Sequence, residues 1–325
     1  MKKINELEKL QVIDVINEQD LGISEFALEK DYMVTDALVA ISKIKNPDFE
    51  LVFCGGTCLS KAYGLLQRVS EDVDIKANPK AKSRLSKSLL RSKMSLLKKD
   101  IEIALNEAGF KSEFIAKDGR DGNQFLEFVI QYSTYFEVSP GMRAQLKLEI
   151  SYSPLRLPKQ DKTLTLLFDT LTKKNSIPSI SMACVDLREA LAEKLITFPR
   201  RLALSMSKSD EKPDSALVRH LYDVYQITEK NSDILNRDLS VLTSLAMQVI
   251  DQDSKDFASQ HPAFVDDAFR EINKAMQLAL NNNDIKRTYE KFIEVMVYEK
   301  NAPSFEVAFS RFSDTLKKVL PQLNC

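Results

Sequence analysis

Asp72 and Asp74, two aspartates separated by one residue, are the side chains of this sequence best suited to bind a metal. In the run SEDVDI, from Ser70 to Ile75, the alternation of polar and apolar residues predicts a strand with both carboxylates on one face. Two carboxylates placed together repel each other unless a cation lies between them. Oxygen ligands of this kind suit Mg²⁺ or Mn²⁺, which bind carboxylates together with nucleotide phosphates. The spacing therefore predicts a metal held by Asp72 and Asp74.

A double glycine precedes these aspartates in the chain. The apolar residues 51–53 predict a short buried strand that ends at Gly55 and Gly56, and from Thr57 to Leu66 apolar residues recur at helical spacing. Glycines let a phosphate approach backbone N–H groups, and the N-terminus of a helix favours an anion. Gly55, Gly56 and the Thr57 hydroxyl are therefore predicted to bind a triphosphate, while the aspartates hold the metal that activates it.

The segment GGTCLSKAYGLLQRVSEDVDIK, from Gly55 to Lys76, resembles the first motif of the polymerase-β-like nucleotidyltransferases. In this wording it is similar to the AbiEii/AbiGii toxin family of bacterial toxin–antitoxin and phage-defence systems. The resemblance implies an α+β fold, with a small mixed sheet and helices in the nucleotidyltransferase domain and a mostly α-helical domain after it. We also place Ser70 of this motif with the nucleotide-binding residues.

A change of pattern near residue 180 predicts the boundary between a nucleotidyltransferase domain, 1–180, and a helical domain, 181–325, that contributes active-site residues. After Asp186 the apolar residues recur three and four apart, as they do in helices. Before the boundary the pattern predicts further strands at Lys111–Lys117, Gln124–Thr134, Gln145–Tyr152 and Thr163–Phe168.

Glu149 is the candidate for a third acidic residue of the site. In the predicted strand QLKLEISY, Lys147 and Glu149 share one face, opposite the apolar residues. Nucleotidyltransferases of the resembled fold commonly carry a third acid on a neighbouring strand, and Glu149 is the best-placed residue for it. The alternative is a surface ion pair on an edge strand, because alternation does not say which face holds the site.

Two helical runs of the second domain carry charges that the resemblance connects with the active site. Lys194 lies off the apolar stripe of DLREALAEKLIT, and Arg219 and Asp223 share one face of VRHLYDVYQI. Taken alone, these are ordinary solvated helix charges. The family has Glu-Lys-Leu and Arg-x-x-Tyr-Asp-x-Tyr helices as its later motifs, which implies that Lys194 contacts the triphosphate and Asp223 completes the site. His220 replaces an acidic residue that is frequent after the arginine in the family, and it leaves Arg219 and Asp223 in place.

Glu29, Lys30 and Asp31 precede the glycine turn, in a predicted helix that Ser24 caps. As isolated charges they are typical of a solvated helix face. The family pattern includes a Glu-Lys-Asp at this distance before the glycines. We therefore expect these residues to brace the active-site strand rather than to take part in the chemistry.

A basic run between Lys80 and Lys99 contains eight cations and no acid. Such a run is most often a solvated helix face. Because it follows the predicted metal-binding strand, contact with an RNA backbone or with nucleotide phosphates is the alternative. The candidate RNA-binding residues are Lys87, Arg91 and Lys98.

The composition narrows the class of protein. With 46 basic and 47 acidic residues the formal net charge is −1, which neither favours nor opposes nucleic acid as a partner. No apolar run is long enough to span a bilayer, and acids interrupt the N-terminal segment, so we expect a cytoplasmic protein without membrane contact. The four cysteines form no disulfide framework, and Cys54 and Cys58 lack two further close ligands for zinc.

Together these features predict a template-independent nucleotidyltransferase that uses Mg²⁺ or Mn²⁺ to transfer NMP from an NTP, with release of pyrophosphate. The resemblance implies a toxin with an RNA acceptor, a tRNA 3′ end first among the candidates, and a cognate antitoxin. A small-molecule or protein acceptor would use the same chemistry. A non-catalytic nucleotide-binding module with a structural Asp-x-Asp is the alternative of another class.

Overall fold

The computed structural model describes residues 1–18, 22–81, 85–174, 180–207 and 214–323. The chain divides into two compact units. The first unit contains Met1–Val185 and the short segment Val295–Tyr298, and the second contains Asp186–Glu294 and Glu299–Cys325. The backbone thus returns once to the first unit before it ends in the second.

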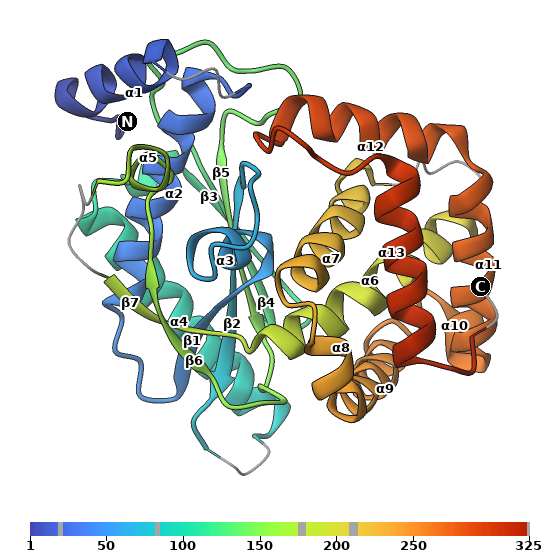
Figure 1. The fold of residues 1–325 in the computed structure, drawn as a ribbon. Coiled ribbons are helices and arrows are strands. Elements are labelled where there is room, and N and C mark those ends of the chain that lie inside the picture. The colour runs from blue at the N-terminus through green and yellow to red at the C-terminus, as the bar shows by residue number, and fades with distance from the viewer. Residues whose placement is uncertain (19–21, 82–84, 175–179, 208–213, 324–325) are drawn as a thin grey trace. The chain divides into compact units, whose positions relative to one another are not determined.

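The first unit is built on a seven-stranded sheet with the order β3-β4-β5-β2-β1-β7-β6 (Figure 1). The pairs β2/β5 and β1/β7 are parallel, and the other neighbours are antiparallel. This mixed sheet, accompanied and followed by helices, confirms the α+β fold class. The strands are β1 Phe49–Cys54, β2 Asp72–Pro79, β3 Ile115–Arg120, β4 Phe125–Ile130, β5 Leu146–Tyr152, β6 Gln160–Leu164 and β7 Ile180–Cys184.

Strand β2 lies inside the sheet and separates apolar from acidic side chains. Val73 and Ile75 are 0% and 1% exposed, and helix α2, Glu25–Ser42, contacts β2 and β5. Because successive residues of a strand point to opposite faces, Asp72 and Asp74 lie on the face opposite Val73 and Ile75. The predicted strand with both aspartates on one face is therefore confirmed.

Helix α2, Glu25–Ser42, is buried around most of its circumference. Ser24 caps it by accepting a hydrogen bond from Ala27 N at 3.2 Å, as predicted. Besides the sheet it contacts three helices of the first unit, α1 Glu6–Glu18, α4 Lys87–Glu107 and α5 Leu167–Thr172. Figure 1 shows α1 beside α2. An interior helix of this kind can carry buried charges only if each is paired.

Lys30 of α2 is 0% exposed and anchors the residues that precede β2 and β5. Its Nζ lies 3.1 Å from Glu71 Oε1. It also donates to the carbonyl of Gln145 at 3.0 Å and to the carbonyl of Arg143. Because Glu71 immediately precedes Asp72, Lys30 braces the start of β2, as predicted for this motif.

Glu29 and Asp31 anchor two other segments of the first unit. The Glu29 carboxylate accepts a hydrogen bond from Tyr135 N at 2.8 Å. Asp31 lies 2.7 Å from Lys61 Nζ, at the end of helix α3, Gly55–Lys61, and accepts a hydrogen bond from Leu167 N at 2.7 Å. The motif therefore fixes a loop, the helix after the glycines and the start of α5.

Four predicted elements differ from the structure. The strand predicted at Gln124–Thr134 is β4, Phe125–Ile130, and ends four residues earlier. The helix predicted from Thr57 to Leu66 is α3, Gly55–Lys61, and is shorter. The strand predicted at Lys111–Lys117 begins only at Ile115, after a 3₁₀ turn. The strand predicted at Thr163–Phe168 is wrong beyond Leu164, where α5 follows, because the Asp31 carboxylate caps the first turn of a helix there.

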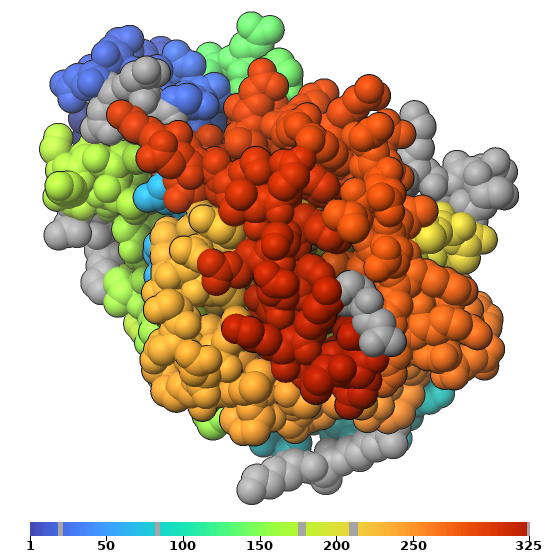
Figure 2. Space-filling model, turned by 45° about the vertical axis from the view of Figure 1, so that its right-hand side comes forward, coloured from blue at the N-terminus to red at the C-terminus, as the bar shows by residue number. Residues whose placement is uncertain are grey.

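The second unit is helical throughout its described regular elements. Helix α6 contacts α7, α9 and α11, and α13 contacts α7 and α9. In Figure 2 the red residues of α13 lie on the visible face beside the orange residues of α12. No described helix is both long and apolar enough to cross a membrane. The helices are α6 Leu187–Ser207, α7 Arg219–Lys230, α8 Ile234–Arg237, α9 Leu239–Asp256, α10 Pro262–Asp266, α11 Ala268–Asn281, α12 Asn283–Met296 and α13 Phe305–Val319.

The returning segment 295–298 holds the loop that joins α3 to β2. Arg68 of this loop forms an antiparallel bridge with Val297. Val69 N donates a hydrogen bond to Met296 O at 2.8 Å. Residues from near the end of the chain thus fix the approach to the Asp-x-Asp strand.

Lys30→Met is expected to lower the free energy of unfolding by about 3–5 kcal/mol, because Glu71 then loses its buried ammonium partner. Urea denaturation at pH 7, followed by circular dichroism, measures the loss. Lys159→Met is the matched control, since Lys159 pairs with Glu50 at the surface, with side chains 39% and 31% exposed. The control is expected to change the same quantity by about 1 kcal/mol or less. Equal losses in both variants would contradict the bracing role of Lys30.

Candidate active site

Gly55 and Asp74 lie in contact where β1 passes directly into α3. Gly55 has a φ of +74°, and a Cβ at this position would lie 2.0 Å from Asp74 Oδ2. Only glycine satisfies both the backbone conformation and the available space. Cys54, the preceding residue, is the register partner of Asp74. The turn predicted to bind phosphate therefore touches a carboxylate predicted to bind the metal.

The hydroxyls of Thr57 and Ser70 are engaged within the first unit. Thr57 is 2% exposed and donates a hydrogen bond to the carbonyl of Asp72, which ties α3 to β2. Ser70 is 8% exposed, and its Oγ accepts a hydrogen bond from Arg68 Nη1 at 3.0 Å. Thr57 thus contacts the backbone of Asp72, Ser70 precedes Asp72 by two residues, and Gly56 follows Gly55 in the first turn of α3. Their nucleotide-binding roles stay predictions.

Carboxylates from three neighbouring strands share one face of the sheet. Asp74 is in register with Glu149 of β5, and Glu149 is in register with Glu127 of β4. Neighbouring strands lie about 4.8 Å apart, so these side chains are close together. The structure thus brings Asp72, Asp74 and Glu149 together. The alternative for Glu149 was a surface ion pair on an edge strand: the ion pair with Lys147 is present, but the edge strand is wrong, because β5 lies between β4 and β2.

Glu127 was not found by sequence reasoning, although its signal was present. The alternation in FLEFVI places Glu127 opposite the buried Leu126 and Phe128, as alternation places Glu149 in β5. What the pattern does not give is the order of strands, which makes β4 the neighbour of β5. Glu127 therefore extends the acidic face by one strand.

Lys147 reduces the repulsion on this face. Its Nζ lies 2.5 Å from Glu149 Oε1 and 2.8 Å from Glu127 Oε2. Burial alone would lower the pKa of Lys147, but hydrogen bonds to the two carboxylates raise it above its usual value. Lys147 is therefore a cation at neutral pH, and it holds Glu149 and Glu127 together.

Arg143, in the segment between β4 and β5, pairs with Asp72. Its Nη2 lies 2.5 Å from Asp72 Oδ1 and 2.7 Å from Oδ2. Burial alone would lower the pKa of Arg143, but the carboxylates of Asp72 and Glu71 raise it. Sequence reasoning did not find Arg143, since a loop residue has no periodic pattern and this contact spans 71 residues of chain.

The donor set fits a divalent cation by its chemistry. Asp72 and Asp74 offer carboxylate oxygens on one face of β2, which is the ligand type that Mg²⁺ and Mn²⁺ prefer. In the part of the chain that the structure describes, no group of three or more His, Cys, Asp or Glu side chains forms a ready metal cluster. The residues that would hold a cation are therefore Asp72 and Asp74, with Glu149 in register beside Asp74.

Lys194 and Asp223 form a buried ion pair in the second unit. Lys194 Nζ, on α6, lies 2.7 Å from Asp223 Oδ2, on α7. The two side chains are 10% and 1% exposed. Charges this deeply buried are rare unless they are paired. Lys194 and Asp223 are therefore not solvated helix charges, which was the interpretation of these residues taken alone.

The comparison with protein families decides the assignment. A model of the family described as "Nucleotidyl transferase AbiEii toxin, Type IV TA system" matches residues 37–311. The chain belongs to this family. It is a nucleotidyltransferase toxin of a type IV toxin–antitoxin system, which implies an NTP substrate and a cognate antitoxin.

Two further comparisons accompany the AbiEii assignment. Among solved structures, MenT4, a nucleotidyltransferase toxin from Mycobacterium tuberculosis H37Rv, matches with 20% sequence identity and a TM-score of 0.38. The match covers 69% of this chain and 72% of that chain. A search of curated proteins gave no match. The AbiEii assignment rests on the family match.

The basic surface of this AbiEii toxin lies along α4. Lys87 and Arg91 are exposed, and Lys98 is half-buried. Lys93 of the same helix is engaged in an ion pair with Asp48. Two further cations of the predicted run lie outside the described residues, Lys82 and Arg84. The three candidate RNA-binding residues thus remain accessible on α4.

Gly55→Ala is expected to reduce nucleotide transfer at least about 100-fold, because the new methyl group would displace the Asp74 carboxylate. Gly64→Ala is the matched control, since Gly64 has a φ of +64° but no atom within 4 Å of the added Cβ. Both variants carry the strain of a positive φ, about 1–2 kcal/mol in the free energy of unfolding. Only Gly55→Ala should lose transfer from an α-labelled NTP. Equal transfer by the two variants would show that the Gly55–Asp74 contact does not matter.

Proposed function

We propose that this AbiEii toxin transfers a nucleoside monophosphate from an NTP to an RNA acceptor, a tRNA 3′ end, with Mg²⁺ or Mn²⁺ as cofactor. The observation that carries the proposal is the contact of Gly55 with the Asp74 carboxylate, beside Asp72 and the in-register Glu149. A structural protein has no need to place like charges next to an anion-binding turn.

The roles of the residues follow from this arrangement. Asp72 and Asp74, with Glu149, would hold the cation, which neutralises the triphosphate and lowers the pKa of the attacking hydroxyl. Gly55, Gly56 and Thr57 would bind the β- and γ-phosphates through backbone N–H groups and a hydroxyl, and Ser70 would support them. In-line attack of the acceptor hydroxyl on the α-phosphate breaks its bond to the β-phosphate oxygen and releases pyrophosphate.

The second unit would contribute Lys194 and Asp223. The family resemblance gives Lys194 a contact with the triphosphate and Asp223 a place in the site. In support, Asp223 holds the Lys194 ammonium by a short, buried ion pair. Such a pair keeps the lysine charged and fixes its head group, as a phosphate ligand requires.

The RNA acceptor is supported by the accessible cations of α4, Lys87, Arg91 and Lys98. Modification of tRNA 3′ ends would block translation, which explains toxicity and is compatible with a role in phage defence. Such an acceptor would place the enzyme in the cytoplasm. Transfer to a small molecule or to a protein would use the same residues, and the experiments below separate these acceptors.

Label from an α-labelled NTP is expected to appear on total tRNA in the presence of Mg²⁺ and to fall at least about 1,000-fold in Asp72→Asn and Asp74→Asn. All four NTPs are tested, and gel electrophoresis followed by autoradiography detects the product. Asp161→Asn is the control, because Asp161 is a 65% exposed carboxylate on β6 that pairs with Lys159. Wild-type label on another acceptor would move the proposal to that acceptor, and full label with the aspartate variants would refute the assigned site.

Replacing Lys87, Arg91 and Lys98 together with alanine is expected to weaken tRNA binding and to reduce the slope of log K against log salt by about 2–3. Each neutralised phosphate contributes about 0.7–0.9 to this slope. Filter binding at several salt concentrations measures it. The control replaces three exposed lysines of the second unit, Lys255, Lys317 and Lys318, with alanine. The same loss in both triple variants would indicate non-specific attraction and remove α4 as the RNA surface.

A further inference from the structure

The Arg143 guanidinium lies against the Asp72 carboxylate at the position that a bound cation would take. A single nitrogen, Nη2, lies between the two oxygens, 2.5 Å from Oδ1 and 2.7 Å from Oδ2. The same nitrogen lies 3.8 Å from Glu71 Oε2. An arginine that only ties two segments together usually uses its planar fork, with two nitrogens on two oxygens. Here one N–H-bearing nitrogen lies at the position that suits a chelated ion.

The backbone of Arg143 is fixed, whereas its head group is open to solvent. Arg143 N donates a hydrogen bond to Glu71 Oε1 at 2.7 Å, and its carbonyl accepts one from Lys30 Nζ. Lys30 and Glu71 are themselves buried, with side chains 0% and 1% exposed. By contrast, the Arg143 side chain is 45% exposed and that of Asp72 is 29% exposed. A change of side-chain rotamer can therefore remove the guanidinium from Asp72 without any movement of the backbone.

The exposed position of this pair makes it exchangeable. Surface ion pairs contribute about 0–1 kcal/mol to stability, because water and salt screen them. A divalent cation carries twice the charge of a guanidinium and is favoured at a site with several carboxylates. Asp74 and Glu149 provide further carboxylates on the same face. Arg143 is thus a weak occupant of a site that suits a stronger one.

We propose that Arg143 is the resident counter-ion of Asp72, that it leaves Asp72 when a divalent cation binds there, and that its freed guanidinium then binds the triphosphate of the incoming NTP. This inference rests on the proposed function, since it takes Asp72 as a metal ligand. Without metal, Arg143 cancels the charge of Asp72 and keeps the acidic face from repelling the nucleotide. With metal, the same side chain adds a phosphate contact whose backbone is already positioned.

The geometry favours the triphosphate as the new partner of Arg143. Guanidinium groups bind phosphate oxygens with two parallel hydrogen bonds, which are stronger than those between neutral groups. The anchored backbone of Arg143 keeps the head group beside Asp72, and Asp72 would share its cation with the phosphates of the nucleotide. After it leaves Asp72, the Arg143 guanidinium needs no other carboxylate as a partner, because the phosphates supply the negative charge.

The test compares two binding equilibria in the full-length protein, wild type against Arg143→Ala. Binding of Mn²⁺ alone, measured from the electron paramagnetic resonance signal of free Mn²⁺, should become at least about 3-fold tighter in Arg143→Ala, because the competing cation is gone. Binding of inorganic tripolyphosphate with Mg²⁺, measured by calorimetry, should become about 10-fold weaker, because a charge-assisted contact is lost. Tighter binding of Mn²⁺ together with weaker binding of tripolyphosphate is the result expected if Arg143 moves from Asp72 to the phosphates.

A merely structural arginine would give a different result. If Arg143 only supported the fold, both ligands would bind more weakly in Arg143→Ala, and this outcome would overturn the proposal. Unchanged Mn²⁺ affinity would show that Arg143 does not compete for Asp72, and unchanged tripolyphosphate affinity would show that it does not reach the phosphates. Arg143→Lys, which keeps the charge, should give Mn²⁺ affinity close to wild type and keeps the test valid if the alanine variant folds poorly.

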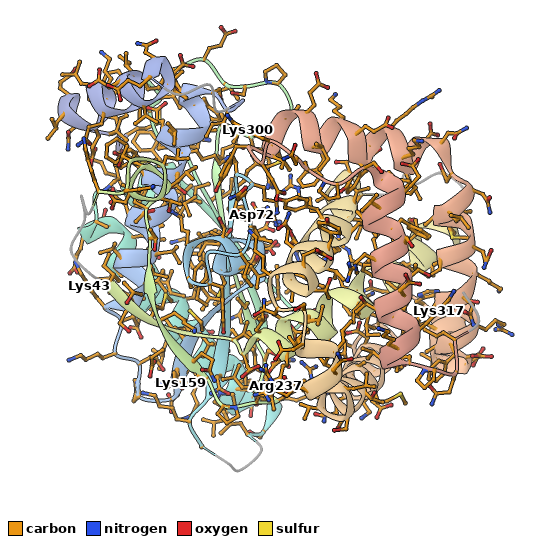
Figure 3. All side chains as sticks on the ribbon, in the orientation of Figure 1. Lys43, Asp72, Lys159, Arg237, Lys300 and Lys317 are labelled. Atoms are coloured by element: carbon orange, nitrogen blue, oxygen red, sulfur yellow. The ribbon has the colours of Figure 1, made fainter. Side chains whose placement is uncertain are left out.

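Two further variants separate this inference from the proposed function. Lys159→Ala removes an exposed cation near Glu50, which is in register with Asn78, far along β2 from Asp72. Figure 3 shows Asp72 and Lys159 well apart within the first unit. Lys159→Ala should leave both affinities unchanged. Asp72→Asn should lose Mn²⁺ binding, and unchanged Mn²⁺ binding in this variant would show that the metal role of Asp72 is wrong. If Asp72→Asn loses Mn²⁺ binding but Arg143→Ala changes neither affinity, only the counter-ion role of Arg143 is refuted.

Discussion

Repulsion among carboxylates on one face of the sheet is the constraint on which the first unit depends. Asp74, Glu149 and Glu127 are in register on three adjacent strands, and Asp72 precedes Asp74 on the same face. Like charges this close would destabilise the strand pairing unless cations lay among them. Lys147 and Arg143 supply those cations from the chain itself. The apolar residues on the opposite face fix the register, because a slip by one residue would exchange buried for charged side chains.

The parts of the site that depend on local sequence could be predicted. Alternation in β2 and β5 is a property of each strand, so the shared face of Asp72 and Asp74, and that of Lys147 and Glu149, followed from the residues alone. The place of the glycines at the N-terminus of α3 also followed from the helical spacing of the residues after them, although the predicted helix began at Thr57 and α3 begins at Gly55. The apolar stripe of α4, from Leu90 to Leu105, obeyed the helical period.

The remaining parts depend on contacts between distant segments, for which a single sequence carries no periodic signal. Arg143 reaches Asp72 across a loop, and the segment 295–298, which begins in the last turn of α12, holds the loop before β2. The wrong strand at residues 165–168 has the same origin, since the helix there is stabilised by Asp31, which lies 136 residues earlier. In each case a hydrogen bond to a distant segment determines the local structure or contact, which the nearby sequence alone does not specify.

Two neighbouring acids, Glu71 just before β2 and Asp72 at its first position, combine a permanent contact with an exchangeable one. Glu71, just before β2, lies in the interior with Lys30, whereas Asp72 lies on the acidic face, and their side chains are 1% and 29% exposed. Breaking the buried pair of Glu71 with Lys30 leaves a charge in a medium of low dielectric, which is costly. Releasing Asp72 from Arg143 costs little free energy, because both groups stay in contact with water. Glu71 and Lys30 also bind the backbone of Arg143. The buried Lys30–Glu71 pair therefore fixes the backbone from which the Arg143 side chain can pair with Asp72 or leave it.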